Sequence, residues 1–147
     1  MRRAGSDDLA KLTALQHAAY APNRAILGVV PIPLQADYAD VLATKEVWVT
    51  GDDGHLDGAL ILEHDADRLL IWSIATDPVG QQRGLGRSML DAAELRARQL
   101  GLPMIKLYTG TRLDHLVGWY GRHGYMVECI EQRSDRSITH MQKILAK

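Results

Sequence analysis

The chain has 147 residues, of which 46% are apolar and 24% charged, and its formal net charge is −1. This is the composition of an ordinary globular domain, and the length suffices for one core but not for two. The charge argues against a broad nucleic-acid or anionic-membrane surface. Nowhere do about 18 apolar residues follow one another, which is the length that a membrane-spanning helix needs. Because no signal segment is evident either, we expect a single domain over residues 1–147, a cytoplasmic location, and neither nucleic acid nor membrane as a partner.

The single cysteine and the histidines point to no covalent or metal chemistry. Cys129 has no partner for an internal disulfide, and its apolar neighbours Val127 and Ile130 predict a buried, unreactive thiol on a strand. The six histidines are scattered, without paired spacing on one predicted helix and without cysteine partners. We therefore expect no metal site.

The N-terminal region predicts a helix followed by an irregular segment. Ser6 and the two acidic residues after it suit the start of a helix that runs to about Tyr20. Residues 21–33 contain three prolines and lead into a short helix around residues 34–42. A loop of this length in a compact domain is usually functional, so we expect it to wall one side of a site.

The rest of the chain predicts a sheet with crossing helices. Residues 47–50, 56–62 and 69–75 read as three antiparallel strands, followed by a helix over residues 85–100 and a strand over residues 104–109. The intervening helix makes the last two strands parallel neighbours. A short helix at 114–123 and a closing hairpin, residues 125–131 with 138–144, complete the order. The predicted class is α+β, α/β/α-like, with a mixed, mainly antiparallel sheet of about six to seven strands flanked by helices.

The turn between the third strand and the long helix predicts an anion site. The first N–H groups of a helix lack intrahelical acceptors, and the helix dipole adds positive charge, so a phosphate binds there readily. Gly84 and Gly86 have no Cβ and let a diphosphate approach the main chain. A dinucleotide-binding or P-loop interpretation is disfavoured, because a third glycine and a Lys-Ser/Thr pair are missing.

The spacing Gln81-x-x-Gly84-x-Gly86 resembles the acetyl-CoA signature of the GNAT superfamily of N-acetyltransferases. Asp77-Pro78 before it, and the segment at residues 119–125 with its Tyr and Gly-aromatic step, are similar to the same family. The order of elements matches over nearly the whole chain, which implies the acyl-CoA N-acyltransferase fold. Several shorter segments further resemble a bacterial subgroup of mostly undefined substrate.

This resemblance implies an acyltransferase with acetyl-CoA as cosubstrate and direct transfer of the acetyl group to an amine. The main chain of Ile74, Ala75 and Thr76 would pair with the pantetheine arm, whose amides can use a free strand edge. The pyrophosphate would be held by the following turn, at Gln81, Gln82, Arg83, Gly84, Leu85, Gly86 and Arg87. Successive N–H groups at a helix start form an anion nest, which agrees with that role.

Tyr120 is the candidate catalytic residue, donating a hydrogen bond or a proton to the departing thiolate; the alternative is a core aromatic beside Trp119. No general base is identified, because the strand at residues 107–109 carries no carboxylate. Glu63 and His64, near the end of a predicted strand, are titratable candidates for this base. Tyr38, Glu63 and Tyr108 are the candidate acceptor contacts.

The acceptor, a small-molecule or peptide amine, is not defined by the sequence, and a homodimer rests on analogy alone. Gln82 stands where the family often has Gly, and Leu116 where the subgroup often has Asn. Both departures would weaken cofactor binding. Leu116 and the missing carboxylate leave open an alternative function, a non-catalytic acyl-CoA-binding sensor or regulatory module of the same fold.

Overall fold

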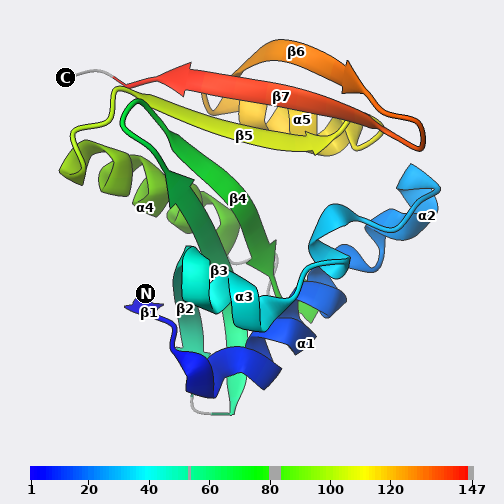
Figure 1. The fold of residues 1–147 in the computed structure, drawn as a ribbon. Coiled ribbons are helices and arrows are strands. Elements are labelled where there is room, and N and C mark those ends of the chain that lie inside the picture. The colour runs from blue at the N-terminus through cyan, green and yellow to red at the C-terminus, as the bar shows by residue number, and fades with distance from the viewer. Residues whose placement is uncertain (53, 80–83, 146–147) are drawn as a thin grey trace.

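A computed structural model describes residues 1–52, 54–79 and 84–145. Figure 1 shows a sheet with helices on both faces, and its strands run in the order β1-β2-β3-β4-β5-β7-β6. The elements in chain order are β1 (Arg2–Arg3), the 3-10 helix η1 (Ser6–Asp8), α1 (Leu9–Tyr20), α2 (Asn23–Leu27), the 3-10 helix η2 (Ile32–Leu34), α3 (Tyr38–Thr44), β2 (Glu46–Asp52), β3 (His55–His64), β4 (Leu69–Thr76), α4 (Leu85–Gln99), β5 (Met104–Gly110), α5 (Asp114–Arg122), β6 (Met126–Gln132) and β7 (Ser137–Ile144). No helix among these described elements is long and apolar enough to span a bilayer.

The sheet confirms the predicted antiparallel meander, the parallel pair and the closing hairpin. β2, β3 and β4 are antiparallel neighbours, β4 and β5 run parallel, and β7 lies between β5 and β6. The sequence analysis missed β1 and α2, and it placed the short third helix too early. That helix begins after Asp37, whose carboxylate accepts from the Ala39 N–H at 2.9 Å and so fixes the N-terminus.

Two apolar clusters pack on opposite faces of the sheet. In β3, Leu60 and Leu62 belong to the cluster with α4, whereas Ala59 and Ile61 belong to the cluster with α1 and α3. This alternation follows from the two-residue period of a strand. Each fully buried aliphatic side chain contributes about 1.5–3 kcal/mol, which holds the helices against both faces.

The sheet parts between β4 and β5. The two strands pair only from Leu69 to Ile71 on β4, opposite residues 105–107. At the same level the β3–β4 register shifts, which leaves Trp72 as an extra residue in β4. A bulge of this kind bends and twists its strand. Beyond it, β4 pairs with β3 alone among the described strands, while β5 stays paired with β7 as far as Gly110.

The tertiary structure decides the burial of two side chains, Cys129 and Glu94. Cys129 is exposed, so the predicted buried thiol is wrong. The reason is that β6 is an edge strand, and nearly all of its side chains reach solvent. Glu94, on the polar face of α4, is 8% exposed and accepts hydrogen bonds from Tyr125 and Lys143. The hairpin that follows α5 covers this carboxylate and supplies its partners.

Candidate active site

A cavity of about 600 Å³ lies where β4 leaves β5. Its walls come from both faces of the sheet: the end of α1 and the segment after it on one face, the start of α4 and the helix α5 on the other. Residues 136–138 of the β6–β7 hairpin close one end. The volume is that of a small-molecule site. The gap therefore exposes the β4 edge and the α4 N-terminus to one ligand.

The start of α4 offers unpaired N–H groups to the cavity. Gly84 has a left-handed φ of 70°, and the Ser88 N–H donates to its carbonyl at 3.1 Å, so the three preceding N–H groups have no acceptor in the helix. Gly86 has ordinary helical φ, and among the described residues a Cβ there would come closest to Trp119, at 3.9 Å. Neither a left-handed φ nor a described neighbour therefore requires glycine at 86. Gln81, Gln82 and Arg83 lie outside the described residues.

The predicted strand residues Ile74, Ala75 and Thr76 all line the cavity. A buried relay fixes α1 against this strand: the Gln16 amide donates to Ser73 Oγ at 3.1 Å, and Ser73 Oγ lies 2.8 Å from the Tyr20 hydroxyl. The Tyr20 hydroxyl in turn donates to the Ile74 carbonyl at 3.2 Å. Because the Tyr20 proton goes to the Ile74 carbonyl, the Ser73 hydroxyl donates its proton to the Tyr20 oxygen, and both hydroxyl groups have partners. Tyr20 is thus held inside the cavity.

Tyr120 comes from α5 and faces the same cavity. Its ring packs edge-on against Trp119 at 5.0 Å and Tyr125 at 5.9 Å. Within the described part of the chain its hydroxyl makes no hydrogen bond. Burial, with a smaller effect of Tyr20, raises the pKa of Tyr120 well above its usual value. The phenol therefore keeps its proton at physiological pH and has a free donor.

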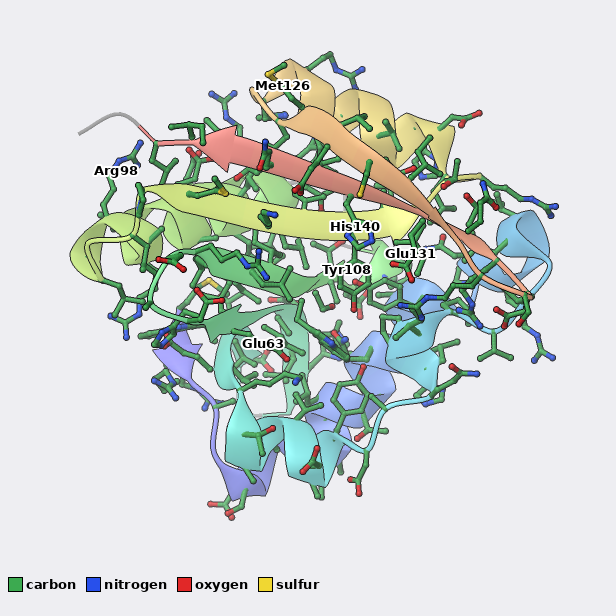
Figure 2. The ribbon with its side chains drawn as sticks, turned by 45° about the horizontal axis from the view of Figure 1, so that its top comes forward. Glu63, Arg98, Tyr108, Met126, Glu131 and His140 are labelled. Carbon is green, nitrogen blue, oxygen red and sulfur yellow. The ribbon has the colours of Figure 1, made fainter. Side chains whose placement is uncertain are left out.

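Tyr108, on β5, also lines the cavity. Burial raises its pKa to about 12, and nearby Tyr20 and Glu63 act in the same direction. Its ring lies 6.2 Å from that of His140, whose Nε2 is 2.8 Å from a Glu131 carboxylate oxygen. Figure 2 shows Tyr108, His140 and Glu131 together across β5, β7 and β6. Tyr108 is therefore a neutral hydrogen-bonding group and not a base at neutral pH.

The other predicted acceptor contacts lie outside the cavity lining. Tyr38 is buried, accepts from the Gln16 amide at 2.9 Å and donates to the Pro33 carbonyl at 2.6 Å. It positions Pro33, which does line the cavity. Glu63 forms an ion pair with Lys45, and His64 ends the same strand near it. Of the three residues predicted to contact the acceptor, the structure places Tyr108 alone at the cavity wall.

Several lining residues were not predicted from sequence as part of a site. Tyr20 ends the first predicted helix, but nothing in the sequence shows that it faces a strand some fifty residues away. Apart from its tyrosines, the described cavity lining has only basic ionisable side chains: Arg87, His115, Arg122 and Arg136. None of the lining residues that the structure describes is Asp or Glu. Groups of three metal-binding side chains are likewise absent from the described residues.

Comparison with known families accounts for this architecture. The profile of the Acetyltransferase (GNAT) family matches residues 13–125. The chain belongs to the GNAT family. Both the sequence resemblance and the predicted fold class are confirmed, because the seven-stranded sheet flanked by helices is the GNAT fold.

Solved GNAT structures superpose on almost the whole chain. The ribosomal-protein-S18-alanine N-acetyltransferase of Escherichia coli gives a TM-score of 0.80 at 16% identity, over 99% of this chain and 93% of that one. The PaiA N-acetyltransferase of Thermoplasma acidophilum, solved in complex with coenzyme A, gives 0.79 at 16% identity, over 98% and 97%. At such identities the likeness concerns the fold.

One relative is closer in sequence over a short stretch. The mycothiol acetyltransferase of Propionibacterium freudenreichii subsp. shermanii is 35% identical over 57 residues. That stretch is 39% of this GNAT chain and 18% of the relative, so this chain spans under a fifth of the relative's length.

Proposed function

We propose that this GNAT chain is an N-acetyltransferase that moves the acetyl group of acetyl-CoA directly to an amine. One observation carries the proposal: a single cavity brings together the start of α4, whose first N–H groups have no acceptor within the helix, the β4 edge that has no neighbour among the described strands, and Tyr120. The helix start suits the diphosphate of a cofactor, the strand edge suits the amides of its long arm, and the neutral phenol suits the sulfur of its thioester. Acetyl-CoA supplies the activated acetyl group.

The residues present fit such a cosubstrate. The N–H groups of Leu85, Gly86 and Arg87 would bind the pyrophosphate, and the Arg87 guanidinium adds a charge-assisted donor. Gln81, Gln82 and Arg83 precede these N–H groups in the chain and would extend the same nest. The β4 edge from Ile74 to Thr76 would pair with the amides of the pantetheine arm, as an added strand does.

Tyr120 supplies the proton donor of the reaction. As the amine nitrogen bonds to the acetyl carbon, the C–S bond breaks and negative charge builds on sulfur. Tyr120, neutral and with its hydroxyl unused by the described residues, donates to that charge. The Tyr120–Trp119–Tyr125 packing holds the hydroxyl in place, so no reorganisation is needed as the charge develops.

The attacking amine must be neutral, and the described cavity residues offer no carboxylate to deprotonate it. The amine loses its proton either to water or to His115, the one histidine among the described lining residues. Amines that are partly neutral near pH 8 need less help than a lysine-type amine of pKa about 10.4. A rate that rises with pH and follows the amine's own pKa is the expected consequence.

The test is thiol release from acetyl-CoA with a panel of small-molecule and peptide amines, run beside calorimetry with CoA. The proposal expects CoA binding together with thiol release that depends on an added amine. The missing carboxylate favours one other function, an acyl-CoA sensor of the same fold. Binding without turnover across the panel would establish the sensor instead, and no heat with CoA would overturn both.

A further inference from the structure

The acceptor side of the cavity is formed by the segment that runs from the last residue of α2 into η2. We call residues 27–33 the strap. Leu27, Val29, Pro31, Ile32 and Pro33 of the strap all line the cavity, on the face opposite to the start of α4. Trp72 and Tyr108 add to the same side from the two diverging strands. This inference rests on the proposed function, which places the cofactor arm at α4 and leaves the strap side to the amine.

Several backbone carbonyl groups of the strap already accept hydrogen bonds from other parts of the protein. The Arg112 guanidinium donates to the Leu27 carbonyl at 3.3 Å, and Arg136 donates to the Val30 carbonyl at 2.9 Å. The Pro33 carbonyl accepts from Tyr38, and the prolines have no N–H to offer. The strap thus presents apolar side chains to the acceptor and few polar atoms.

The strap is also held close to the sheet. A Cβ built at Gly110 would lie 2.4 Å from Leu27 Cδ2, so Leu27 fills the space above β5 that a side chain would need. Arg112 ties the first residue of the strap to the loop that follows β5, and Arg136 ties its middle residue, Val30, to the loop that follows β6. The apolar wall is therefore a fixed surface and not a loose loop.

Charge works against an acceptor with a second cation. The described lining carries Arg87, His115, Arg122 and Arg136 but no acidic side chain. Three acids outside the lining are engaged in ion pairs or hydrogen bonds: Glu63 with Lys45, Glu131 with Arg133 and His140, and Asp135 with Arg136. Arg87 is assigned to the pyrophosphate and Arg136 is paired with Asp135, so the deciding feature is the missing carboxylate. A second ammonium group would enter a partly desolvated site without a counter-ion, which is unfavourable.

We propose that the acceptor is an apolar monoamine: a primary amine whose adjoining group is an uncharged alkyl or aryl body that packs on the strap and Trp72. Polyamines and other polycations are disfavoured, because the described lining offers no carboxylate to their second ammonium group. The amine is the one charged group such a molecule carries, and it loses its proton before attack, so no charge without a counter-ion remains in the cavity.

The test compares pentylamine with 1,5-diaminopentane, which share a carbon chain and differ by one ammonium group. Binding to the CoA-saturated protein is measured by calorimetry, and kcat/KM is measured by thiol release. We expect the monoamine to be preferred by about tenfold or more in both assays after correction for the two equivalent amines. Equal values, or a preference for the diamine, overturn the inference while leaving N-acetyl transfer in place.

A matched pair of variants tests the cause. Val29→Glu places a carboxylate on the strap, and Val29→Gln places a side chain of the same shape without the charge. The glutamate variant is expected to shift preference toward the diamine by about tenfold relative to the glutamine variant. Preference for the monoamine in binding without any thiol release supports the acceptor class and overturns the acetyl-transfer function. An unchanged ratio in the glutamate variant overturns the electrostatic argument.

Discussion

Replacing Gly86 by alanine should raise the stability of the protein while lowering its affinity for CoA. Gly86 is a helical residue with ordinary φ, and an added Cβ would meet protein atoms no closer than 3.9 Å. Alanine is favoured over glycine in a helix by up to about 1 kcal/mol, less in the first turn. With an unfolding entropy of about 2.1 cal/mol/K per residue, a gain of about 0.5–1 kcal/mol raises Tm by about 2–3 °C.

The same methyl group occupies space beside the N–H groups that would hold the pyrophosphate. Losing one hydrogen bond to a charged group costs about 1.5–3 kcal/mol, so the Kd for CoA should rise by about ten- to hundredfold. Opposite signs for stability and binding separate a ligand cradle from a plain structural turn. A turn that merely starts the helix would gain stability and lose no affinity.

The matched control is Gly121→Ala. Gly121 lies in the last turn of α5, where an added Cβ meets nothing within 4 Å, and it is outside the cavity lining. This variant should gain similar stability and bind CoA as the wild type does. Thermal unfolding and calorimetry on both variants give the four values needed. Unchanged CoA affinity in Gly86→Ala would refute the placement of the diphosphate at the start of α4.

Three further predictions follow from single contacts. Tyr120→Phe should lower kcat by about 10²–10³-fold with little change in the Kd for CoA, measured by thiol release and calorimetry; equal losses in both would assign the tyrosine to packing. Gly110→Ala should raise KM for the amine but not the Kd for CoA, because its Cβ would displace Leu27. Asp8→Asn should destabilise the fold by about 1–3 kcal/mol in urea unfolding, since Asp8 accepts a bidentate bond from Arg2. Hydrogen bonds from Arg2 and the Gly5 N–H hold the pKa of Asp8 far below its usual value. The difference in free energy of unfolding between the wild type and Asp8→Asn is therefore full above about pH 4 and shrinks as acid protonates the carboxylate. A constant difference down to about pH 2 would contradict this account.

The local signals in the sequence proved sufficient for most elements. Apolar alternation predicted the strands at residues 47–50, 56–62 and 69–75, and the helix from Leu85 begins where Gly84 turns left-handed. These features depend on neighbours a few residues apart, which is the range that propensity and periodicity report. The failure at Cys129 has the opposite origin, because being on an edge strand is a property of the whole sheet.

By itself, the sequence determined the order of the main strands and helices apart from β1 and α2, the glycine spacing of the anion turn and the position of Tyr120 on a late helix. Tertiary structure alone decided that β4 leaves β5 beyond Ile71, that β7 inserts between β5 and β6, and that Tyr20 reaches the β4 edge. The cavity exists because of those three facts. Its walls come from segments far apart in the chain, brought together by strand register and by a one-residue bulge at Trp72. The apolar alternation of a strand sets which face each side chain takes, but the place of a bulge and the strand that pairs on each edge depend on packing across the whole sheet.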